Sequence, residues 1–454
     1  MRHAENVIIG GGLAGLSAGA RLRQEGESVA VIDRAEVPGG VIRTDLSDDG
    51  FLSEQGPNSL QVRSKRVASF LQSIGLDADR MDPKPEARRR FIVREGELIA
   101  LPSGPLSFAR TKWISSAAKR SLLKEPFRSR RETLDTDESL ADFVRRRLGQ
   151  EFLDYGVNPL VGGIYAGDPE KLSARHGFPR LWRLEDRHGS FIRGAVAKQL
   201  GFGRDPDALR TETFSFQRGM QTLPDRLAAQ LGSDWRPNTT VAEIVREYGG
   251  WSIQTESERI QARRLILAVP AFALSSLPLP DDLRVALQPL ERIPYPPVTS
   301  WFLGYKRGQI QHPLDGFGVL IPEKEGASIL GVVFSSSLFE GRAREDHVAL
   351  TIFVGGTRQP ELAERSDDAL LPKVAADLKR YLGVSGDPVV SRRTHWPRAI
   401  PQIEVGFGAK LAAMEAAERD WPGLHLIGNY RGGIAAGDTI RNALALADRI
   451  GTAD

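Results

Sequence analysis

A glycine-rich turn between a strand and a helix is the feature that most constrains the fold of this chain. Gly10, Gly12 and Gly15 form GxGxxG directly after an apolar strand and at the start of a helical pattern. A second apolar strand, residues 28–32, ends next to Asp33. In such a βαβ unit the glycines let the backbone approach a pyrophosphate, and the acid accepts hydrogen bonds from a ribose. The first domain is therefore predicted to bind a dinucleotide.

A second glycine turn indicates which dinucleotide is bound. Gly39, Gly40 and Arg43 come soon after the second strand, in a pattern typical of FAD enzymes with this fold, where an arginine suits a phosphate. Near the C-terminus, residues 426–429 predict a strand entering a glycine turn, and residues 437–438 precede the last helix. A second helix N-terminus there would offer N–H groups to the flavin end of the cofactor. FAD is therefore the predicted cofactor.

Composition excludes several other classes of protein. The chain of 454 residues has no cysteine, which excludes disulfides, Fe–S clusters and thiolate nucleophiles, and its seven histidines lack any metal-ligand spacing. No metal is expected, and a net charge of +3 indicates no nucleic-acid partner. The longest apolar run, residues 265–274, is too short to span a bilayer, and the first residues do not resemble a signal peptide. We therefore expect a cytoplasmic protein.

The order of predicted elements favours a nucleotide-binding domain that is interrupted twice. A helix is predicted near 60–80, a hairpin over 89–101, and mostly helices to about 205. Short strands follow over 239–268, and a strand-rich segment covers 295–357. A helix around 369–383, another strand and the C-terminal strand–turn–helix complete the chain.

These features accompany motifs that place the chain in a known group. It resembles the protoporphyrinogen oxidases of the flavin-monoamine-oxidase-like superfamily from end to end. The matching stretches are IIGGGLAGLSA, GGVIRT, EQGPNS, GGIYAGDPEKLS, FPRLWRLE, RGMQTLPDRL and GNYRGG. Amine oxidases of this fold usually carry a GExT-type motif where this chain has GNY. Two residues depart from the family pattern: Ile403 replaces a usual tyrosine, and Phe407 replaces a usual histidine.

The resemblance implies an α/β architecture of three parts. These are a discontinuous FAD-binding Rossmann-type domain, a mixed-sheet substrate domain and a helical membrane-binding domain. The implied bounds are 1–85, 206–293 and 396–454 for the FAD-binding domain, 86–91 and 294–395 for the substrate domain, and 92–205 for the helical domain.

The resemblance also implies the residues of the site. The cofactor contacts would fall on Gly10, Gly12, Leu13, Ala14, Gly15, Asp33, Arg34, Gly39, Gly40, Arg43, Gly56, Pro57, Asn58, Val241, Ala268, Trp396, Gly428, Asn429, Asp438 and Ile440. The substrate contacts would fall on Arg90, Gly163, Gly318, Leu320, Val333 and Phe353, with Arg90 and Gly318 closest to the chemistry. The implied reaction is oxidation of protoporphyrinogen IX to protoporphyrin IX by hydride transfer to FAD, which oxygen or a quinone reoxidises.

The chemistry of a porphyrinogen agrees with such residues. The macrocycle is large and apolar with carboxylates on its rim, so apolar walls and one arginine are expected in its pocket. Coproporphyrinogen III oxidation to coproporphyrin III stays open as an alternative, because Arg88 and Arg89 could bind additional carboxylates. A flavin amine oxidase is a further alternative, although the GNY motif and Arg90 argue against it.

A basic and apolar segment over 105–131 suggests peripheral contact with a membrane. Leu122, Leu123 and Phe127 alternate with cations there, together with Trp113 and Ile114. The cations are Arg110, Lys112, Lys119, Arg120, Lys124, Arg128, Arg130 and Arg131. Such a segment can lie on an anionic leaflet, here the cytoplasmic face. The sequence leaves a homodimer open.

Overall fold

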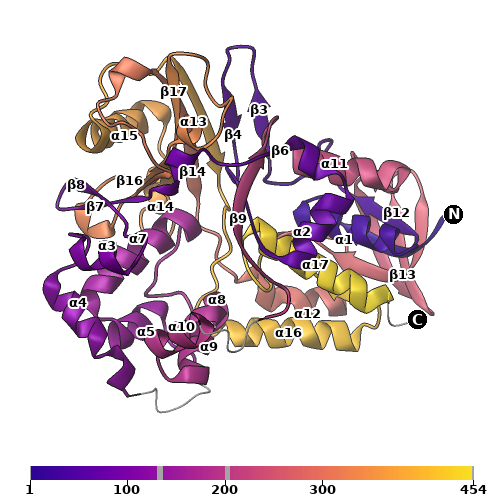
Figure 1. Ribbon diagram of the computed structural model, residues 1–454. Helices are drawn as coiled ribbons and strands as arrows, with labels where there is room; N and C mark the ends of the chain where they lie inside the picture. The colour runs from indigo at the N-terminus through magenta and orange to yellow at the C-terminus, as the bar shows by residue number, and fades with distance from the viewer. Residues whose placement is uncertain (1, 130–135, 200–204, 452–454) are drawn as a thin grey trace.

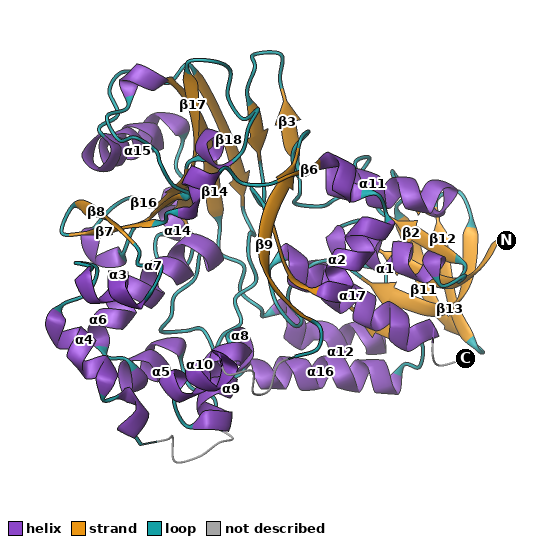
Figure 2. Ribbon diagram, in the orientation of Figure 1, coloured by secondary structure: helices purple, strands orange, loops and turns teal. Residues whose placement is uncertain are grey.

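Two seven-stranded β-sheets, two smaller sheets and a group of helices make up the described structure (Figure 1). It is a computed structural model that describes residues 2–129, 136–199 and 205–451. The nucleotide-binding part carries both described ends of the chain, and the second sheet lies beside it with the helices of residues 105–199 below (Figure 2). The fold is therefore a mixed α/β fold with two separate large sheets.

The nucleotide-binding part is built on a largely parallel sheet with the strand order β10-β2-β1-β13-β12-β11, in which β19 also pairs with β13. Ile8 packs on one face of this sheet, whereas Val7 and Ile9 pack on the other. The strands are β1 (Arg2–Ile9), β2 (Val29–Ile32), β10 (Trp235–Arg236), β11 (Val241–Glu247), β12 (Gly250–Thr255), β13 (Arg259–Leu267) and β19 (Leu424–Leu426). The first face is covered by α1 (Leu13–Gln24), α2 (Lys65–Ser73), α11 (Thr222–Leu231) and α17 (Ala436–Gly451), and the second by α12 (Asp281–Glu291) and α16 (Phe407–Asp420). The predicted βαβ unit is confirmed, with β1 and β2 parallel.

The second sheet is mixed and has the strand order β18-β14-β17-β16-β15-β7-β8. Its strands are β7 (Phe91–Arg94), β8 (Glu97–Ala100), β14 (Val298–Lys306), β15 (Gly318–Leu320), β16 (Ile329–Val333), β17 (His347–Gly355) and β18 (Val390–Trp396). One face packs against α15 (Asp367–Leu382) through side chains such as Trp301, Ile352 and Leu378. The opposite face is turned toward the helices and the nucleotide-binding part.

The predicted hairpin over 89–101 is confirmed, but the domain boundary predicted after residue 91 divides it. β7 and β8 pair from Phe91–Ala100 to Arg94–Glu97, and β7 also runs parallel to β15. Because this pairing keeps β8 in the second sheet, the sheet extends to Ala100.

Smaller strands connect the two sheets. β3 (Thr44–Leu46) and β4 (Leu52–Glu54) form one hairpin, and β9 (Ala208–Phe216) pairs with both β5 (Leu60–Ser64) and β6 (Arg80–Met81). β3 to β6 carry the chain from the glycine turns toward β7 of the second sheet, and β9 pairs with β5 and β6 after the helical part.

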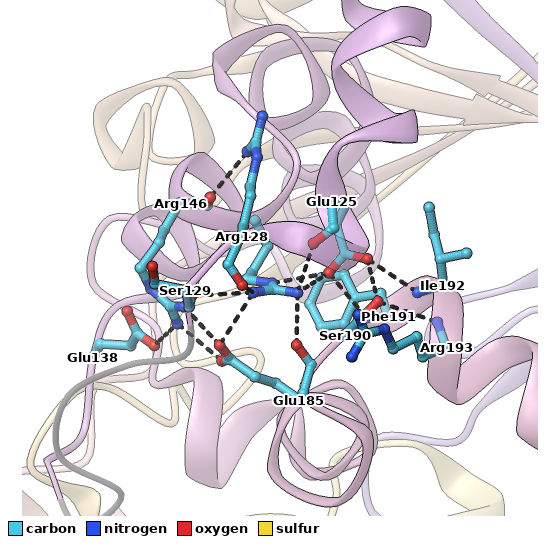
Figure 3. A network of polar contacts seen from close by, with 12 residues as sticks. Glu125, Arg128, Ser129, Glu138, Arg146, Glu185, Ser190, Phe191, Ile192 and Arg193 are labelled. Atoms are coloured by element: carbon cyan, nitrogen blue, oxygen red, sulfur yellow. Dashed lines mark hydrogen bonds and ion pairs between the residues drawn. The ribbon is translucent and has the colours of Figure 1, made fainter.

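The helical part packs around its own apolar cluster, which includes Leu140, Phe143 and Trp182. Its helices are α3 (Pro105–Arg110), α4 (Ser116–Leu123), α5 (Leu140–Arg147), α6 (Gln150–Phe152), α7 (Asn158–Leu160), α8 (Ala174–Gly177), α9 (Pro179–His188) and α10 (Phe191–Gln199). Two π-helical turns, Leu153–Val157 and Val161–Tyr165, flank α7. Glu125 is fully buried beside Ser190 at the start of α10 (Figure 3). Glu125 also forms an ion pair with the buried Arg147. This network attaches the basic segment to α5 and α10.

Candidate active site

The first glycine turn is closed by tight backbone packing. A Cβ on Gly10 would come within 2.8 Å of the carbonyl oxygen of Ala268, and a Cβ on Gly15 would overlap the carbonyl oxygen of Gly10. Ala268 in turn donates its N–H to the carbonyl of Ile9 at 2.8 Å. Only glycine therefore lets α1 lie this close to the ends of β1 and β13, as the Rossmann pattern requires.

Gly12 differs from its neighbours because it faces open space. A Cβ at Gly12 would meet no atom within 4 Å, and Gly12 is the N-cap of α1 without a side-chain cap. Leu13 and Ala14 begin the helix, so their N–H groups point out of its N-terminus. Positive dipole and free donors at an open backbone surface form a cradle that fits a pyrophosphate.

The two glycine turns lie directly against each other. Gly12 and Gly39 form a parallel bridge, and Gly39 donates its N–H to the carbonyl of Gly11 at 2.8 Å. Gly39 and Gly40 both have positive φ, and a Cβ on Gly40 would lie 3.4 Å from Gly12 Cα. The second turn is therefore one wall of the cradle, as its position in the sequence predicted.

Asp33 holds the end of β2 against this cradle. Its carboxylate accepts from the N–H of Gly11 at 2.5 Å and from the N–H of Ala35 at 2.8 Å. The Asp33 N–H donates to the carbonyl of Arg236, and the Asp33 carbonyl accepts from the N–H of Thr239. Thr239 lies two residues before Val241, which begins β11. Arg34 is exposed beside them. The predicted adenosine end, Asp33 and Val241, is thus brought together in the structure.

Arg43 is engaged by its own loop. The guanidinium donates to the carbonyls of Val37, Pro38 and Ile42 at 2.8–3.0 Å. Burial lowers the pKa of Arg43 against the opposing charges of Asp33 and Asp225. The side chain therefore stabilises the second glycine turn, and a phosphate contact stays a prediction.

The predicted flavin end collects segments from three regions of the chain. Trp396, at the end of β18, donates its indole N–H to the carbonyl of Gln55 at 2.8 Å. Gly56 packs so closely on Val41 that a Cβ would overlap the Val41 carbonyl, and Pro57 and Asn58 follow it. The segment Gln55–Asn58 therefore lies between the second glycine turn and the edge strand of the second sheet.

The C-terminal turn closes the nucleotide-binding part. Gly428 packs against the buried ring of Tyr430, with Asn429 half-buried between them. Asp438 lies in the first turn of α17 and pairs with Arg441 at 3.0 Å, and Ile440 is fully buried. The predicted second helix N-terminus is present, preceded by the strand β19.

One face of the second sheet carries most of the predicted substrate residues. Leu320 is paired with Gly331, Gly331 with Phe353, and Phe353 with Ser300. Directly paired residues share a face, and so do residues two apart on one strand. Gly318 is two residues from Leu320, and Val333 is two residues from Gly331, so both join this row. We call this surface, defined by Gly318, Leu320, Val333 and Phe353, the floor.

Trp396 belongs to the same face of the sheet. Ser300 pairs with Thr394, which lies two residues before Trp396 on β18. The predicted flavin-side residue and the predicted substrate residues therefore share one surface. Val298, the partner of Trp396, packs with Phe353 in one apolar cluster that also includes Ala166.

Arg90 and Gly163 lie at the edge of the floor. The Arg90 guanidinium lies 5.2 Å from the ring centroid of Phe317, and Phe317 and Val333 pack against the same apolar cluster. Gly163 faces Leu320 so closely that a Cβ would overlap Leu320 Cδ2. Sequence reasoning missed Phe317, although an aromatic residue directly before Gly318 was a signal that could have found it.

The two departures from the family pattern fall in packed positions. Ile403 and Phe407 are both buried in the core between the first sheet and α12 and α16. The ring of His176 lies 6.2 Å from that of Phe407. The departures therefore change the packing of this core, and neither residue belongs to the floor.

Comparison with known proteins identifies the class. The model of the family "flavin containing amine oxidoreductase" matches residues 13–451. The chain belongs to this family and is an FAD-dependent oxidoreductase, in agreement with the dinucleotide cradle.

Individual relatives define the group within the family. The mitochondrial protoporphyrinogen oxidase of Nicotiana tabacum is 32% identical, and the alignment covers 98% of this chain and 94% of that protein. Protoporphyrinogen oxidase 2 of Arabidopsis thaliana is also 32% identical, over 98% and 93% of the two chains. The coproporphyrinogen III oxidase of Bacillus subtilis is 26% identical, over 96% and 95%. By these relationships the chain is a member of the protoporphyrinogen oxidase group.

Solved structures share the fold. An Exiguobacterium protein provisionally named protoporphyrinogen oxidase superimposes with a TM-score of 0.80 at 23% identity, over 100% of this chain and 99% of the other. A reduced UDP-galactopyranose mutase gives a TM-score of 0.74 at 16% identity, over 99% and 96%. At such identities the likeness establishes the architecture alone.

Proposed function

We propose that the chain oxidises protoporphyrinogen IX to protoporphyrin IX, with FAD as hydride acceptor and oxygen or a quinone as the final electron acceptor. The observation that carries the proposal is the floor, which holds Gly318, Leu320, Val333 and Phe353 on the same sheet face as Trp396. An extended, mostly apolar surface beside the predicted flavin end suits a flat, apolar macrocycle.

The chain's own residues bind and orient the substrate in this proposal. Leu320, Val333 and Phe353 contact the macrocycle and exclude water, and Gly318 allows its backbone to come close. Arg90, held over Phe317, binds a propionate of the rim by a charge-assisted hydrogen bond. FAD supplies the hydride acceptor when bound. Pyrrole N–H protons leave without a dedicated base, so orientation is the main contribution of the protein.

The charge at the edge of the floor favours protoporphyrinogen over a substrate with more carboxylates. Arg89 forms an ion pair with Asp315, so it is already neutralised. Arg88 and Arg90 are both exposed, but of the two only Arg90 lies over the ring of Phe317, beside the floor. Arg90 is therefore the cation that we expect to bind the rim.

The test compares two substrates. Purified protein is mixed with freshly reduced protoporphyrinogen IX or coproporphyrinogen III, and porphyrin fluorescence is followed above the autoxidation blank. We expect a clear preference for protoporphyrinogen IX. A preference for coproporphyrinogen III would move the protein to the alternative reaction, and activity with neither would overturn the proposal.

We also propose that the helical part touches the cytoplasmic face of a membrane peripherally. Leu106, Leu123 and Phe127 are 67%, 74% and 83% exposed, and Arg120 and Lys124 are exposed near them. Trp113 and Ile114 pack inward instead, with the Trp113 indole donating to the carbonyl of Tyr155. Arg130 and Arg131 lie outside the described residues. Within the described ranges, no helix has the length and hydropathy to cross a bilayer.

A further inference from the structure

Glu54 and Arg342 form a buried pair between the two halves of the molecule. Their side chains are 3% and 2% exposed, and Arg342 Nη2 lies 4.0 Å from Glu54 Oε1. Glu54 is the last residue of β4, directly before the flavin-side segment Gln55–Asn58. Arg342 follows α13 (Ser335–Leu338), which comes directly after β16 and packs on β17 of the second sheet. Glu54 opens the EQGPNS stretch of the family resemblance, but no role was predicted for it or for Arg342.

Further hydrogen bonds hold the Glu54 carboxylate and the Arg342 guanidinium in place. Glu54 accepts from the Thr44 hydroxyl at 2.7 Å and from the Met220 N–H at 2.9 Å. Arg342 donates to the Ser215 hydroxyl at 2.9 Å and to the Phe216 carbonyl at 3.0 Å, whereas its buried Nη1 has no partner among the described residues.

Burial dominates the titration of the pair. It raises the pKa of Glu54 to about 7, against the bonds from Thr44 and Met220 and the charge of Arg342. Burial likewise lowers the pKa of Arg342 against the charge of Glu54. A buried ion pair of this kind is often no more stable than apolar residues of the same volume, so stability is a weak reason for having it here.

Contacts lead from the pair to both sides of the site. On the flavin side, Glu54 precedes Gln55, whose carbonyl accepts the Trp396 indole N–H. On the substrate side, the Arg342 guanidinium lies 5.4 Å from the ring centroid of Phe339. Phe339 belongs to the apolar cluster against which Val333 of the floor and Phe317, the ring beneath Arg90, both pack. A small cavity of about 10 Å³, which has room for one water, lies beside the pair. It is lined by Glu54 and Arg342 and also by Asn58 and Phe302.

We propose that Glu54 and Arg342 are positioning residues that hold the segment Gln55–Asn58 in register with the floor. The pair acts through its neighbours: Glu54 fixes the backbone that supports Trp396, and Arg342 fixes the Phe339 wall behind Val333. Its loss displaces the reacting carbon relative to the flavin, which slows hydride transfer more than it weakens binding. The inference rests on the proposed function only for the identity of the substrate.

The test is a double-mutant cycle on the FAD-loaded protein. Glu54→Gln and Arg342→Gln are compared with the double variant in anaerobic flavin reduction by protoporphyrinogen IX. We expect each single variant to reduce its flavin roughly 10- to 100-fold more slowly at saturating substrate, with substrate affinity and FAD content near those of the wild type. The double variant should be less impaired than the product of the two single effects, because it leaves no unpaired buried charge. Arg344→Gln, an exposed change in the same loop, is the matched control and should have no effect.

Two outcomes would overturn the inference. Wild-type reduction rates in folded, FAD-loaded single variants would remove any positioning role, and strictly multiplicative effects would show that the two residues act independently. If Glu54→Gln fails to fold, Glu54→Asp and Arg342→Lys keep the charges while shifting them, and the same slowed reduction is expected. Visible circular dichroism of the bound flavin should also change in the Glu54 variants, and this readout stands even if protoporphyrinogen proves not to be the substrate.

Discussion

Leu320 of the second sheet occupies the space directly above Gly163 of the helical part, so that a Cβ on Gly163 would overlap Leu320 Cδ2. Gly163 lies in the π-helical turn Val161–Tyr165, and the neighbouring Gly162 is covered in the same way by the guanidinium of Arg358. Two consecutive glycines thus let this helix end pack closely against the edge of the floor and against Arg358. The helical part is therefore a wall of the proposed substrate site as well as the carrier of the basic segment.

A side chain at position 163 should push Leu320 into the proposed pocket. We expect Gly163→Val to raise KM for protoporphyrinogen IX about tenfold or more while leaving FAD content unchanged, because no cofactor segment contacts this glycine. Adding Leu320→Ala should restore part of the affinity by vacating the space. Steady-state kinetics of the single and double variants measures this, and equal KM values in all of them would place the substrate elsewhere.

Arg90 is expected to bind a propionate without contacting the cofactor. Loss of one charge-assisted hydrogen bond costs about 1.5–3 kcal/mol, so Arg90→Ala should raise KM roughly 10- to 100-fold. Arg88→Ala, a change at an exposed arginine two residues earlier, is the control and should leave KM unchanged. Loss of FAD from the Arg90 variant, read from the flavin absorbance, would contradict the assignment.

Two glycines of the first glycine turn are expected to serve different purposes, Gly12 in cofactor binding and Gly15 in folding. A Cβ at Gly12 meets no protein atom within 4 Å, whereas one at Gly15 would overlap the carbonyl of Gly10. Gly12→Val should therefore give a folded protein without FAD, because its side chain fills the space of the pyrophosphate. Gly15→Val should reduce soluble, folded protein itself. Far-UV circular dichroism and flavin absorbance distinguish the two, and full FAD occupancy in Gly12→Val would refute the phosphate site.

Local sequence signals predicted the elements well but could not predict which strands meet. The βαβ unit, the 89–101 hairpin and the last strand–turn–helix are set by short-range patterns of apolar residues and glycines. The pairing of β7 with β15 joins residues more than 200 positions apart, and no local pattern specifies it. The boundary predicted after residue 91 divides the β7–β8 hairpin for that reason.

The candidate site, too, contains residues that the sequence could predict and residues that it could not. The glycine positions and Asp33 were predictable because the spacing itself reports the geometry. The pairing of Glu54 with Arg342 was not, since neither the EQGPNS stretch that Glu54 opens nor the polar residues around Arg342 indicate that the two side chains are buried together. Arg43 was predicted from its loop, but its bonds to three carbonyls depend on how that loop closes.

The buried network of the helical part should control its stability in acid. Glu125 is fully buried; burial would raise its pKa, but bonds from Ser190, the Phe191 N–H and Arg147 together hold that pKa below the usual value. A depressed carboxyl pKa adds stability above the unfolded value, near 4.5, which is lost as pH falls toward the folded pKa. We expect Glu125→Gln to lower the free energy of unfolding by about 3–5 kcal/mol at neutral pH and to weaken its dependence on pH below 4.5.

Chemical unfolding at several pH values tests this expectation. Glu170→Gln, which breaks the exposed pair with Arg145, is the matched control and should change stability by less than about 1 kcal/mol. Equal effects of the two substitutions would show that the buried network carries no special stability.

Membrane contact should depend on exposed cations and apolar side chains of the basic segment. Lys119 is held by the carbonyls of Ala109 and Thr111, so Arg120 and Lys124 are the better targets. We expect charge reversal at both, or Leu123→Ser with Phe127→Ser, to abolish co-sedimentation with anionic liposomes. A double reversal of Lys379 and Arg380 on α15 is a control of equal charge and should bind as the wild type does. Unchanged binding by the variants of the basic segment would contradict the proposed contact.

Anaerobic flavin reduction tests the central claim most directly. The yellow FAD-loaded protein is mixed with protoporphyrinogen IX without oxygen, and the loss of flavin absorbance is followed together with porphyrin fluorescence. The account predicts rapid bleaching at a rate that saturates with substrate, and porphyrin formation once air is admitted. Flavin that stays oxidised in the presence of protoporphyrinogen IX would contradict it.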